Sequence, residues 1–510
     1  MWTALWKRAY GGQQISIIRG HLDRTFSSLS IYNYRLYYIG QLVSLSGTWM
    51  QTTAQAWLVL RLTDSPAALG TVTMLQFLPI TLLTLFGGVL ADRLPKRTVV
   101  FGTQSVAAVQ ALVLSFLVLS NTVQVWHIYV LAILLGTVTA FDNPTRQAFV
   151  VELVGREHLQ NAIALNSSLF NAARVIGPAT GGIVISTVGI GQTFLLNGLS
   201  FLPVIAGLCL MRPRELYAAP TPKRGNVFAQ VLEGLRYAAT AEEILLTLVA
   251  VAVLGTFGYN FTTILPLIAK YVLHAGALGL GLLSSALGLG SLAAALGMAS
   301  ARRTSQAVLL VAAALFSAVL ILIGLSTWAP VTVGLLGVLG VAGIVFSSSA
   351  NTRLQLAAPS ELRGRVISLY FLLFAGTTPI GGFLVGALAA RFGTQPAVVL
   401  MGSICLTGIA GAGLYARHQQ RHRTQRSGAQ AGNEVSDSKG NTGSEATNQH
   451  RLQGTTPNGQ AGEAALYPAK HAKGDEGHQG RDQQGVHDGE RPEVGRQGDD
   501  AAENVRATDG

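Results

Sequence analysis

The sequence has little charge, few cysteines and no enzyme motif, and each shortage excludes a class of protein. Only 12% of its 510 residues are charged, whereas soluble domains carry about 25%. The two cysteines, Cys209 and Cys405, fall inside apolar runs and are expected to behave as small apolar residues. The motifs HExxH and GxSxG, a phosphate loop and paired histidines are missing. We therefore expect a membrane protein that is not an enzyme and holds no metal or cofactor.

Long apolar runs are what the chain has in abundance. A helix needs about 20 apolar residues to cross the hydrocarbon core of a bilayer, and twelve runs reach that length. The fold class expected is all-α integral membrane, with twelve transmembrane helices. Their predicted positions are 36–60, 68–90, 98–119, 125–142, 163–187, 191–211, 244–270, 276–300, 305–327, 330–350, 366–390 and 395–416.

The net charge of +11 lies in the short links between these runs. No basic face with interleaved aromatic residues occurs, so nucleic-acid binding is not expected. The links after even-numbered spans hold most of the arginines and lysines, whereas the opposite links hold only Arg61, Lys270 and Arg391. Positive charge collects on the cytoplasmic side of membrane proteins, so both termini are predicted to be cytoplasmic.

Composition divides the chain into five segments. Residues 1–30 form a charged leader without the apolar core of a cleavable signal. A linker with prolines and mixed charge, 212–243, separates two six-helix bundles, 31–211 and 244–416. Residues 417–510 contain few aliphatic side chains and cannot bury enough apolar surface to fold. We predict that they form a disordered cytoplasmic tail.

Several motifs occur in both halves, which indicates two six-helix pseudo-repeats. The link Gly88-Val-Leu-Ala-Asp92-Arg93-Leu-Pro-Lys96-Arg97 has a partial counterpart, Gly297-Met-Ala-Ser-Ala301-Arg302-Arg303, that lacks the acid. Three more pairs follow further along the halves. Asn143-Pro-Thr-Arg146 matches Asn351-Thr-Arg353, and Glu152 matches Glu361-Leu-Arg363-Gly-Arg365. Gly177-Pro178-Ala-Thr-Gly181-Gly182 matches Pro379-Ile-Gly381-Gly382. Parallel six-helix repeats with a substrate site between them belong to a known transporter architecture.

With Asn33-Tyr-Arg35-Leu and Trp49-Met-Gln51, these motifs resemble one branch of the major facilitator superfamily. That branch contains the bacterial enterobactin exporter and macrolide-efflux-type permeases. The resemblance implies a transporter of the bacterial cytoplasmic membrane that exports a small amphipathic or anionic molecule by alternating access. A siderophore, a macrolide-like drug or a metabolite would fit. It also implies antiport with protons and a functional monomer in the lipid bilayer.

The resemblance assigns roles to three groups of residues. The gating loop of the family corresponds to Gly88, Asp92, Arg93, Lys96 and Arg97, with Pro95 where the family usually has glycine. The cytoplasmic motif corresponds to Arg146, Glu361, Arg363 and Arg365. Small residues let helices approach closely, and proline bends a helix. Helix rocking, or simple tight packing, is therefore expected at Gly177, Pro178, Gly181, Gly182, Pro379, Gly381 and Gly382.

Arg174 is the only unambiguous charge deep in an expected span, and such residues usually face a cavity or a partner. We expect it to hold an anionic group of the substrate; an ion pair with Asp142 is the alternative. No acid lies at mid-depth, so Asp142, near the cytoplasmic end of its span, is the proton-carrier candidate. Other candidates for the cavity wall are Gln41, Gln51, Gln55, Asn171, Asn260 and Thr262.

Two alternatives to export stay open. The same fold runs as an importer or a lipid flippase in other proteins. A membrane sensor or assembly factor that uses the tail as an interaction arm would not transport at all. The acid of the gating loop and the glycines of the fifth span favour transport.

Overall fold

The computed structural model describes residues 26–217, 227–299 and 305–415, and every regular element in them is a helix. They belong to one compact unit, Met1–Gln430. Most of the predicted leader, the middle of the linker and all of the predicted tail lie outside the described residues. The unit is divided below into a first half, 26–217, and a second half, 227–415.

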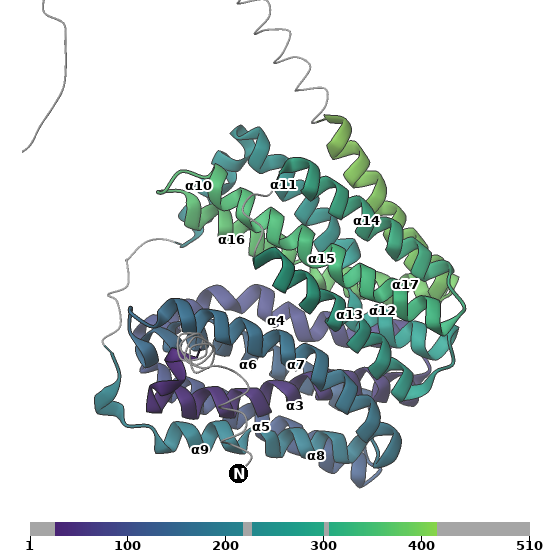
Figure 1. The fold of residues 1–510 in the computed structure, drawn as a ribbon. Helices are drawn as coiled ribbons and strands as arrows, with labels where there is room; N and C mark the ends of the chain where they lie inside the picture. Colours follow the sequence, from purple (N-terminus) through teal and green to yellow (C-terminus); the bar gives the residue numbers. More distant parts are fainter. Residues whose placement is uncertain (1–25, 218–226, 300–304, 416–510) are drawn as a thin grey trace, which may run out of the picture. The chain divides into compact units, whose positions relative to one another are not determined.

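The first half contains six predicted spans, of which the sixth is divided in two. Pro203 occupies the first turn of the second piece, where its missing N–H costs nothing. Short 3₁₀ turns, Ser27–Ser30 and Pro213–Glu215, flank the bundle. The helices are α3 (Tyr32–Thr63), α4 (Pro66–Arg93), α5 (Lys96–Leu119), α6 (Val125–Val154), α7 (Leu159–Thr187), α8 (Ile190–Ser200) and α9 (Leu202–Leu210) (Figure 1).

The second half begins with a linker helix, α10 (Val227–Thr240). Its first span, Glu242–Val272, is made of α11 (Glu242–Val253), the π-helical turn η3 (Leu254–Gly258), α12 (Phe261–Leu267) and the π-helical turn η4 (Ile268–Val272). The remaining helices are α13 (Gly276–Ala299), α14 (Gln306–Leu325), α15 (Ala329–Ala357), α16 (Arg363–Phe374), α17 (Thr378–Phe392) and a last helix at Thr394–Tyr415.

Local sequence signals set several helix ends. The Ser65 hydroxyl accepts a hydrogen bond from the N–H of Ala68 at the start of α4, and the Ser305 hydroxyl accepts one from Val308 at the start of α14. Both are N-caps that satisfy an otherwise unpaired backbone donor. Pro66 follows the first cap directly, at the position where proline suits a helix best.

Eleven stretches of the described residues are long and apolar enough to cross a membrane. The stretch that completes the predicted set is α3, which has 32 residues but is less apolar than the others. It packs against α7, α8 and α9, and one side of it carries buried polar residues: Gln41, Ser44, Gln51 and Gln55. A helix enclosed by protein on that side needs fewer lipid-facing apolar residues. The all-helical membrane fold is confirmed.

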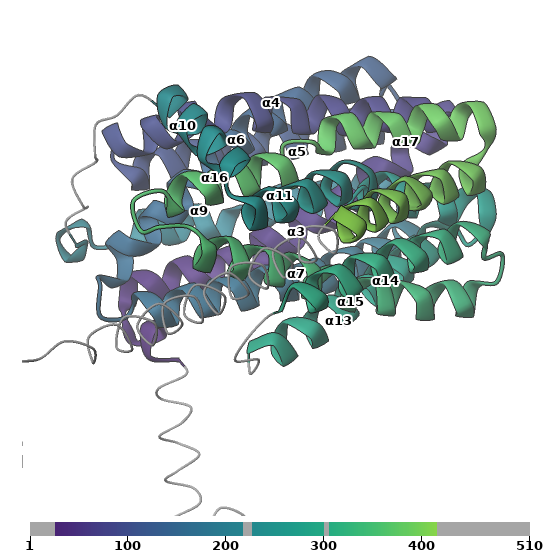
Figure 2. The same ribbon diagram turned by 90° about the horizontal axis from the view of Figure 1, so that it is seen from above.

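The two halves meet along two equivalent helix pairs, α4 with α17 and α7 with α13 (Figures 1 and 2). Glycines make both contacts. A Cβ added to Gly386 would lie 2.7 Å from Cα of Gly70, and one added to Gly281 would lie 3.1 Å from Cα of Gly182. Small residues of this kind let helix backbones approach directly. All four glycines lie near the helix ends that the charge pattern predicts to be extracellular.

An ion pair closes the same end. The ammonium of Lys270 lies 2.6 Å from Asp64 Oδ1 and also donates to the carbonyl of Leu60 at 2.5 Å. The hydroxyl of Tyr271 donates to the same Asp64 oxygen at 2.9 Å. These contacts join the end of α3 to the end of the first span of the second half. Asp64 and Lys270 are called the closing ion pair below.

We expect Asp64→Asn to raise the share of molecules open at this end by about two- to five-fold, the range for an exposed pair. Spin labels at Val188→Cys and Trp328→Cys, two exposed positions on opposite halves, would report the opening in a Cys209→Ser background. Lys270→Gln should have the same effect, and the double variant should add nothing. An unchanged distance distribution in all three would contradict a closing role.

The pH dependence of this contact follows from its charges. The hydrogen bond from Lys270, followed by that from Tyr271, lowers the pKa of the Asp64 carboxyl below its usual range. The contact therefore has its full stability above the ordinary pKa of an aspartate, and it loses that stability as the pH falls from there through the lowered pKa. The same spin labels should therefore report no opening of the wild type between pH 7 and pH 5.

Candidate functional site

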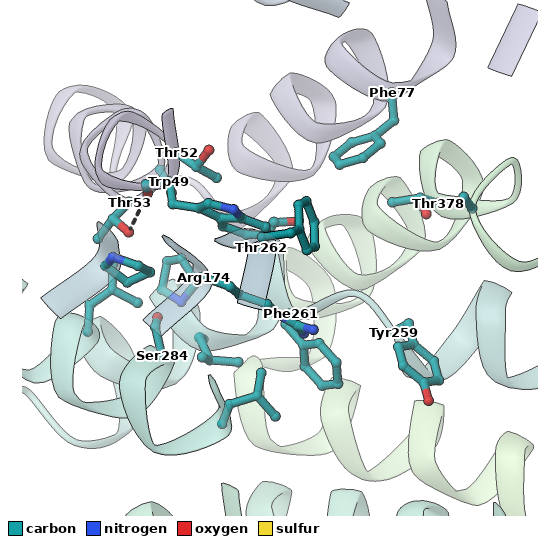
Figure 3. A pocket seen from close by; sticks show the side chains of 18 of the residues that line it. Trp49, Thr52, Thr53, Phe77, Arg174, Tyr259, Phe261, Thr262, Ser284 and Thr378 are labelled. Carbon is teal, nitrogen blue, oxygen red and sulfur yellow. Dashed lines mark hydrogen bonds between the residues drawn. The ribbon is translucent and has the colours of Figure 1, made fainter. Parts of the chain in front are cut away.

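A cavity of about 350 Å³ lies between the two halves. Both halves contribute to its wall, through α3, α4 and α7 on one side and α12, α13, α15, α16 and α17 on the other (Figure 3). Six aromatic residues line it: Trp49, Phe77, Phe170, Tyr259, Phe261 and Phe374. Six hydroxyl residues also line it: Thr52, Thr53, Thr262, Ser284, Ser347 and Thr378.

Arg174, on α7, is the charged residue of the described cavity wall. Its guanidinium lies 6.0 Å from the ring centre of Trp49, and Figure 3 shows it between Trp49 and Phe261. Among the described residues no carboxylate pairs with it. Asp142, the partner considered from the sequence, pairs with Arg146 instead. The sequence-based expectation of an arginine facing a cavity therefore agrees with its position, and the alternative ion pair with Asp142 does not form.

The first span of the second half is irregular beside the cavity. It passes from the π-helical η3 to α12 through Tyr259 and Asn260, and π-helical turns are frequent at functional sites. The Tyr259 hydroxyl donates to the carbonyl of Gly343 at 2.6 Å. Its ring stacks on Phe316 with centroids 4.8 Å apart. The break thus fixes an aromatic side chain at the cavity wall.

Asp142 lies away from the cavity, in a buried polar network of the first half. Its Oδ2 is 2.8 Å from Nε of Arg146, one helical turn along α6. Its Oδ1 accepts hydrogen bonds from Thr103 at 2.6 Å and from Gln104 at 3.1 Å, both on α5. Arg146 Nη1 donates to Gln41 Oε1 at 2.7 Å. Three donors, from α5 and α6, therefore hold this carboxylate in place within the first half.

The three glutamines of α3 point into the first half and not into the cavity. Gln41 accepts from Arg146. Gln51 donates to Gln110 on α5, and it accepts from Asn197 on α8. Gln55 donates to Gln76 on α4 at 2.8 Å. A buried amide needs hydrogen-bond partners, and neighbouring helices supply them as well as a substrate would.

The remaining polar candidates divide between cavity and protein interior. Thr262 lines the cavity. Asn171 bonds to the carbonyl of Ser167 on its own helix and is not among the cavity-lining residues that the structure describes. Asn260 is fully buried and donates to the carbonyl of Thr256. Of the expected wall residues, Arg174 and Thr262 therefore reach the cavity.

The gating loop is bound to the first half. Lys96 forms an ion pair with Glu152 at 2.8 Å, and Arg97 Nε donates to the carbonyl of Leu208 at 2.7 Å. Arg93 is exposed, and the side chain of Asp92 is not among those described. A Cβ at Gly88 would meet no atom within 4 Å. Pro95 precedes α5 directly and leaves that helix intact.

Charges at the same end also hold the linker helix on the second half. Arg365, on α16, forms an ion pair with Glu233 on α10. Arg353 Nη2 lies 2.6 Å from Glu243 Oε1. Glu361 accepts a hydrogen bond from Ser360 and is exposed, as is Arg363. The cytoplasmic motif expected from the sequence is thus spread over both halves, with Arg146 in the buried network of the first.

The glycine motifs serve two kinds of contact. Within the halves, Gly177 and Gly181 pack on α3, and Gly381 packs on Thr256 and Asn260. Between the halves, Gly182 faces α13, and Gly382 faces Thr73 on α4. Pro178 lines the cavity, and Pro379 lies in the first turn of α17. In each motif, therefore, one glycine packs within its own half and the next contacts the other half.

The cavity aromatics were not singled out from the sequence. Aromatic residues also occur on lipid-facing surfaces, as Phe86 and Phe116 do here. The signal that distinguishes Trp49 is its position in a polar stretch of α3, just after Thr48 and shortly before Gln51, Thr52 and Thr53. That pattern indicates an enclosed helix but does not tell which side faces a cavity.

Comparisons with known proteins place these features in context. Residues 23–435 match the model of a family described as transmembrane secretion effector. The chain is 28% identical to multidrug efflux pump Tap of Mycolicibacterium fortuitum over 68% of its own length and 87% of that protein. It is 22% identical to macrolide efflux protein A of Streptococcus pyogenes, over 72% and 92% of the two chains.

Two further similarities are more limited. The staphyloferrin A transporter of Staphylococcus aureus is 25% identical over 44% of this chain and 56% of that protein. Among solved structures, a bacterial homologue of the human lysosomal transporter Spinster, crystallised in an inward-facing and unoccupied conformation, superposes with a TM-score of 0.59. It is 12% identical and covers 76% of this chain and 96% of that one, which supports the fold alone.

Proposed function

Because this chain belongs to the transmembrane secretion effector family of major facilitator transporters, we propose that it exports a small amphipathic or anionic molecule from the cytoplasm. The observation that carries the proposal is the cavity between the halves, to which both contribute wall residues. Alternating access needs a site of this kind, because the two halves rock around it and expose it to one side of the membrane at a time.

The predicted orientation supports loading of the cavity from the cytoplasm. If the arginine-rich links are cytoplasmic, the closed end of the halves, with the closing ion pair and the four contact glycines, is extracellular. The cavity then faces the cytoplasm and is loaded from there. The relatives named as an efflux pump and an efflux protein support export over import or lipid flipping.

Gating in this proposal involves the loop after α4. In the conformation described, Lys96 and Arg97 hold the loop on the first half. When the extracellular end opens, the cytoplasmic ends must approach, and in this proposal Asp92, the acid of the loop, then binds a donor on the second half. Asp92→Asn should then reduce transport without loss of expression.

Proton coupling would involve Asp142, the carboxylate of the described residues that is buried within a span. Protonation would weaken its ion pair with Arg146 and release the guanidinium, whose other partner, Gln41, lies on α3. A change of proton binding at α6 would thereby alter the contact between α6 and α3. The Discussion gives a test that distinguishes this role from a structural one.

Growth inhibition in a pump-deficient bacterium tests export directly. Cells expressing the wild type should resist at least one compound in a panel of dyes, drugs, siderophores and aromatic acids. Ser284→Trp fills the cavity and should abolish that resistance, whereas Leu282→Trp, on the exposed side of the same helix, should retain it. Resistance that survives Ser284→Trp would mean that the cavity is not the transport site.

A truncation separates transport from a scaffold role. Removal of residues 418–510 should leave resistance unchanged if the protein is a transporter, because the cavity lies wholly within the described helices. A sensor or assembly factor that acts through this segment would lose its function. Membrane levels of both forms should be compared by immunoblot.

A further inference from the structure

The cavity contains an unneutralised positive charge. Arg174 lines it, no carboxylate of the described residues pairs with it, and no acidic residue is among the described cavity-lining residues. Its guanidinium carbon lies 6.0 Å from the ring centre of Trp49, which is a cation–π contact. A cation inside a membrane protein is costly unless it is paired, so this arginine favours a negatively charged ligand.

Flat aromatic surfaces approach the cavity from both halves. Trp49 and Phe170 form an edge-to-face pair with ring centres 5.8 Å apart on the first half. Tyr259 and Phe374 contact each other on the second half, with ring centres 4.6 Å apart. Aromatic rings prefer other rings in stacked or edge-to-face geometry, with a gain beyond the area they bury. A ligand between these pairs would gain most if it were itself aromatic.

The hydroxyl groups of the wall do not neutralise the charge of Arg174, so the ligand must do so. Thr52 donates to the carbonyl of Thr48, and Thr53 donates to that of Trp49, so both satisfy their own helix. Hydroxyls are neutral and cannot balance the guanidinium. The volume of about 350 Å³ lies at the small end of the range for ligand sites, which disfavours a molecule as large as a macrolide.

On the basis of the proposed function, we propose that the transported molecules are small aromatic acids, with the anionic group on Arg174 and the ring between Trp49 and Tyr259. Cationic compounds are excluded, because they would meet Arg174 and the wall residues that the structure describes include no carboxylate to offset it. The loaded cavity is neutral and the empty one is positive. Arg174 is therefore the residue that determines charge specificity.

A ligand series of one shape tests the charge preference. The probes are 2-naphthoic acid, 2-naphthamide and 2-naphthylmethylamine, with binding to the purified full-length protein measured by calorimetry at pH 7. The acid should bind about 10- to 100-fold more tightly than the amide, the range for a hydrogen-bonded charged pair, and the amine should bind least. Equal affinity for the acid and the amide, or tighter binding of the amine, would overturn the proposal.

Variants assign the preference to its residue. Arg174→Gln should remove the difference between acid and amide, and Arg174→Glu should reverse the order so that the amine binds best. Arg61→Gln, an exposed arginine of α3, is the control and should leave the order unchanged. If an Arg174 variant fails to fold, the ligand series on the wild type still tests the charge preference. Trp49→Leu should weaken the binding of the acid about three- to ten-fold.

The binding assay is independent of transport. If the acid binds as expected but proteoliposomes do not move it, the proposed function fails and the charge specificity stands. If cells export a cationic or neutral compound through the cavity, while the wild type shows no preference for the acid, the proposed function stands and this inference fails.

Discussion

Gly281→Leu is expected to force the two halves apart where α7 and α13 cross, and to lower transport at least ten-fold. A Cβ at Gly281 would already lie 2.8 Å from the carbonyl oxygen of Pro178, so backbone must move. Overpacking of this kind costs about 1–3 kcal/mol, which corresponds to a shift of about 5- to 150-fold between the closed and open states of that end. The spin labels at Val188→Cys and Trp328→Cys measure the shift.

The second crossing provides a matched test. Gly386 contacts Gly70 in the same way between α17 and α4, so Gly386→Leu should have a comparable effect, and the double variant should add to it. Gly334→Leu is the control, since a Cβ at this exposed glycine meets no atom within 4 Å. If Gly281→Leu and Gly334→Leu gave the same distances and transport rates, close approach at the crossing would not matter.

Asp142→Asn is expected to lower the melting temperature of the purified protein by about 5–10 °C. The substitution leaves the guanidinium of Arg146 without its charge partner, although 21% of that side chain is exposed. Removal of one member of a buried pair typically costs a few kcal/mol, here roughly 3 kcal/mol, and each kcal/mol is worth about 2–4 °C in a large domain. Arg212→Gln, in an exposed pair with Glu215, should cause no resolvable change.

The double variant Asp142→Asn/Arg146→Gln separates structural support from proton transfer. It should recover most of the lost stability, because neither charge is then left without its partner. If Asp142 carries the proton, substrate-evoked proton movement in proteoliposomes should be absent from the double variant in spite of its stability. Normal coupling in that variant would remove Asp142 from the proton pathway and leave it as a support for Arg146.

The membrane fold was predictable from the sequence because the bilayer imposes a simple condition on each span. About 20 apolar residues in one run satisfy it, and the condition does not depend on what lies beside the helix. The repeated glycine and arginine motifs likewise identified the family, which the match over residues 23–435 confirms. The cytoplasmic location of the termini stays a prediction from the charges of the links.

Single residues of α3 and α7 show where that reasoning stopped. Gln51 bonds within the first half, while the adjacent Thr52 faces the cavity. Arg174 lines the cavity, and Asn171, one turn before it, does not. In both cases residue type correctly indicated an enclosed polar environment. It did not tell a substrate cavity from a hydrogen-bond network between helices.

The sequence by itself therefore determined the all-helical membrane fold, the repeated motifs of its halves and the presence of one deep arginine. The tertiary structure decided that no carboxylate of the described residues pairs with Arg174, that Asp142 is bound to Arg146, and that Gly181 packs within a half while Gly182 joins the two. The reason is rotational: adjacent residues of a helix point about 100° apart. Which side meets a cavity is set by helices that lie far away in the chain.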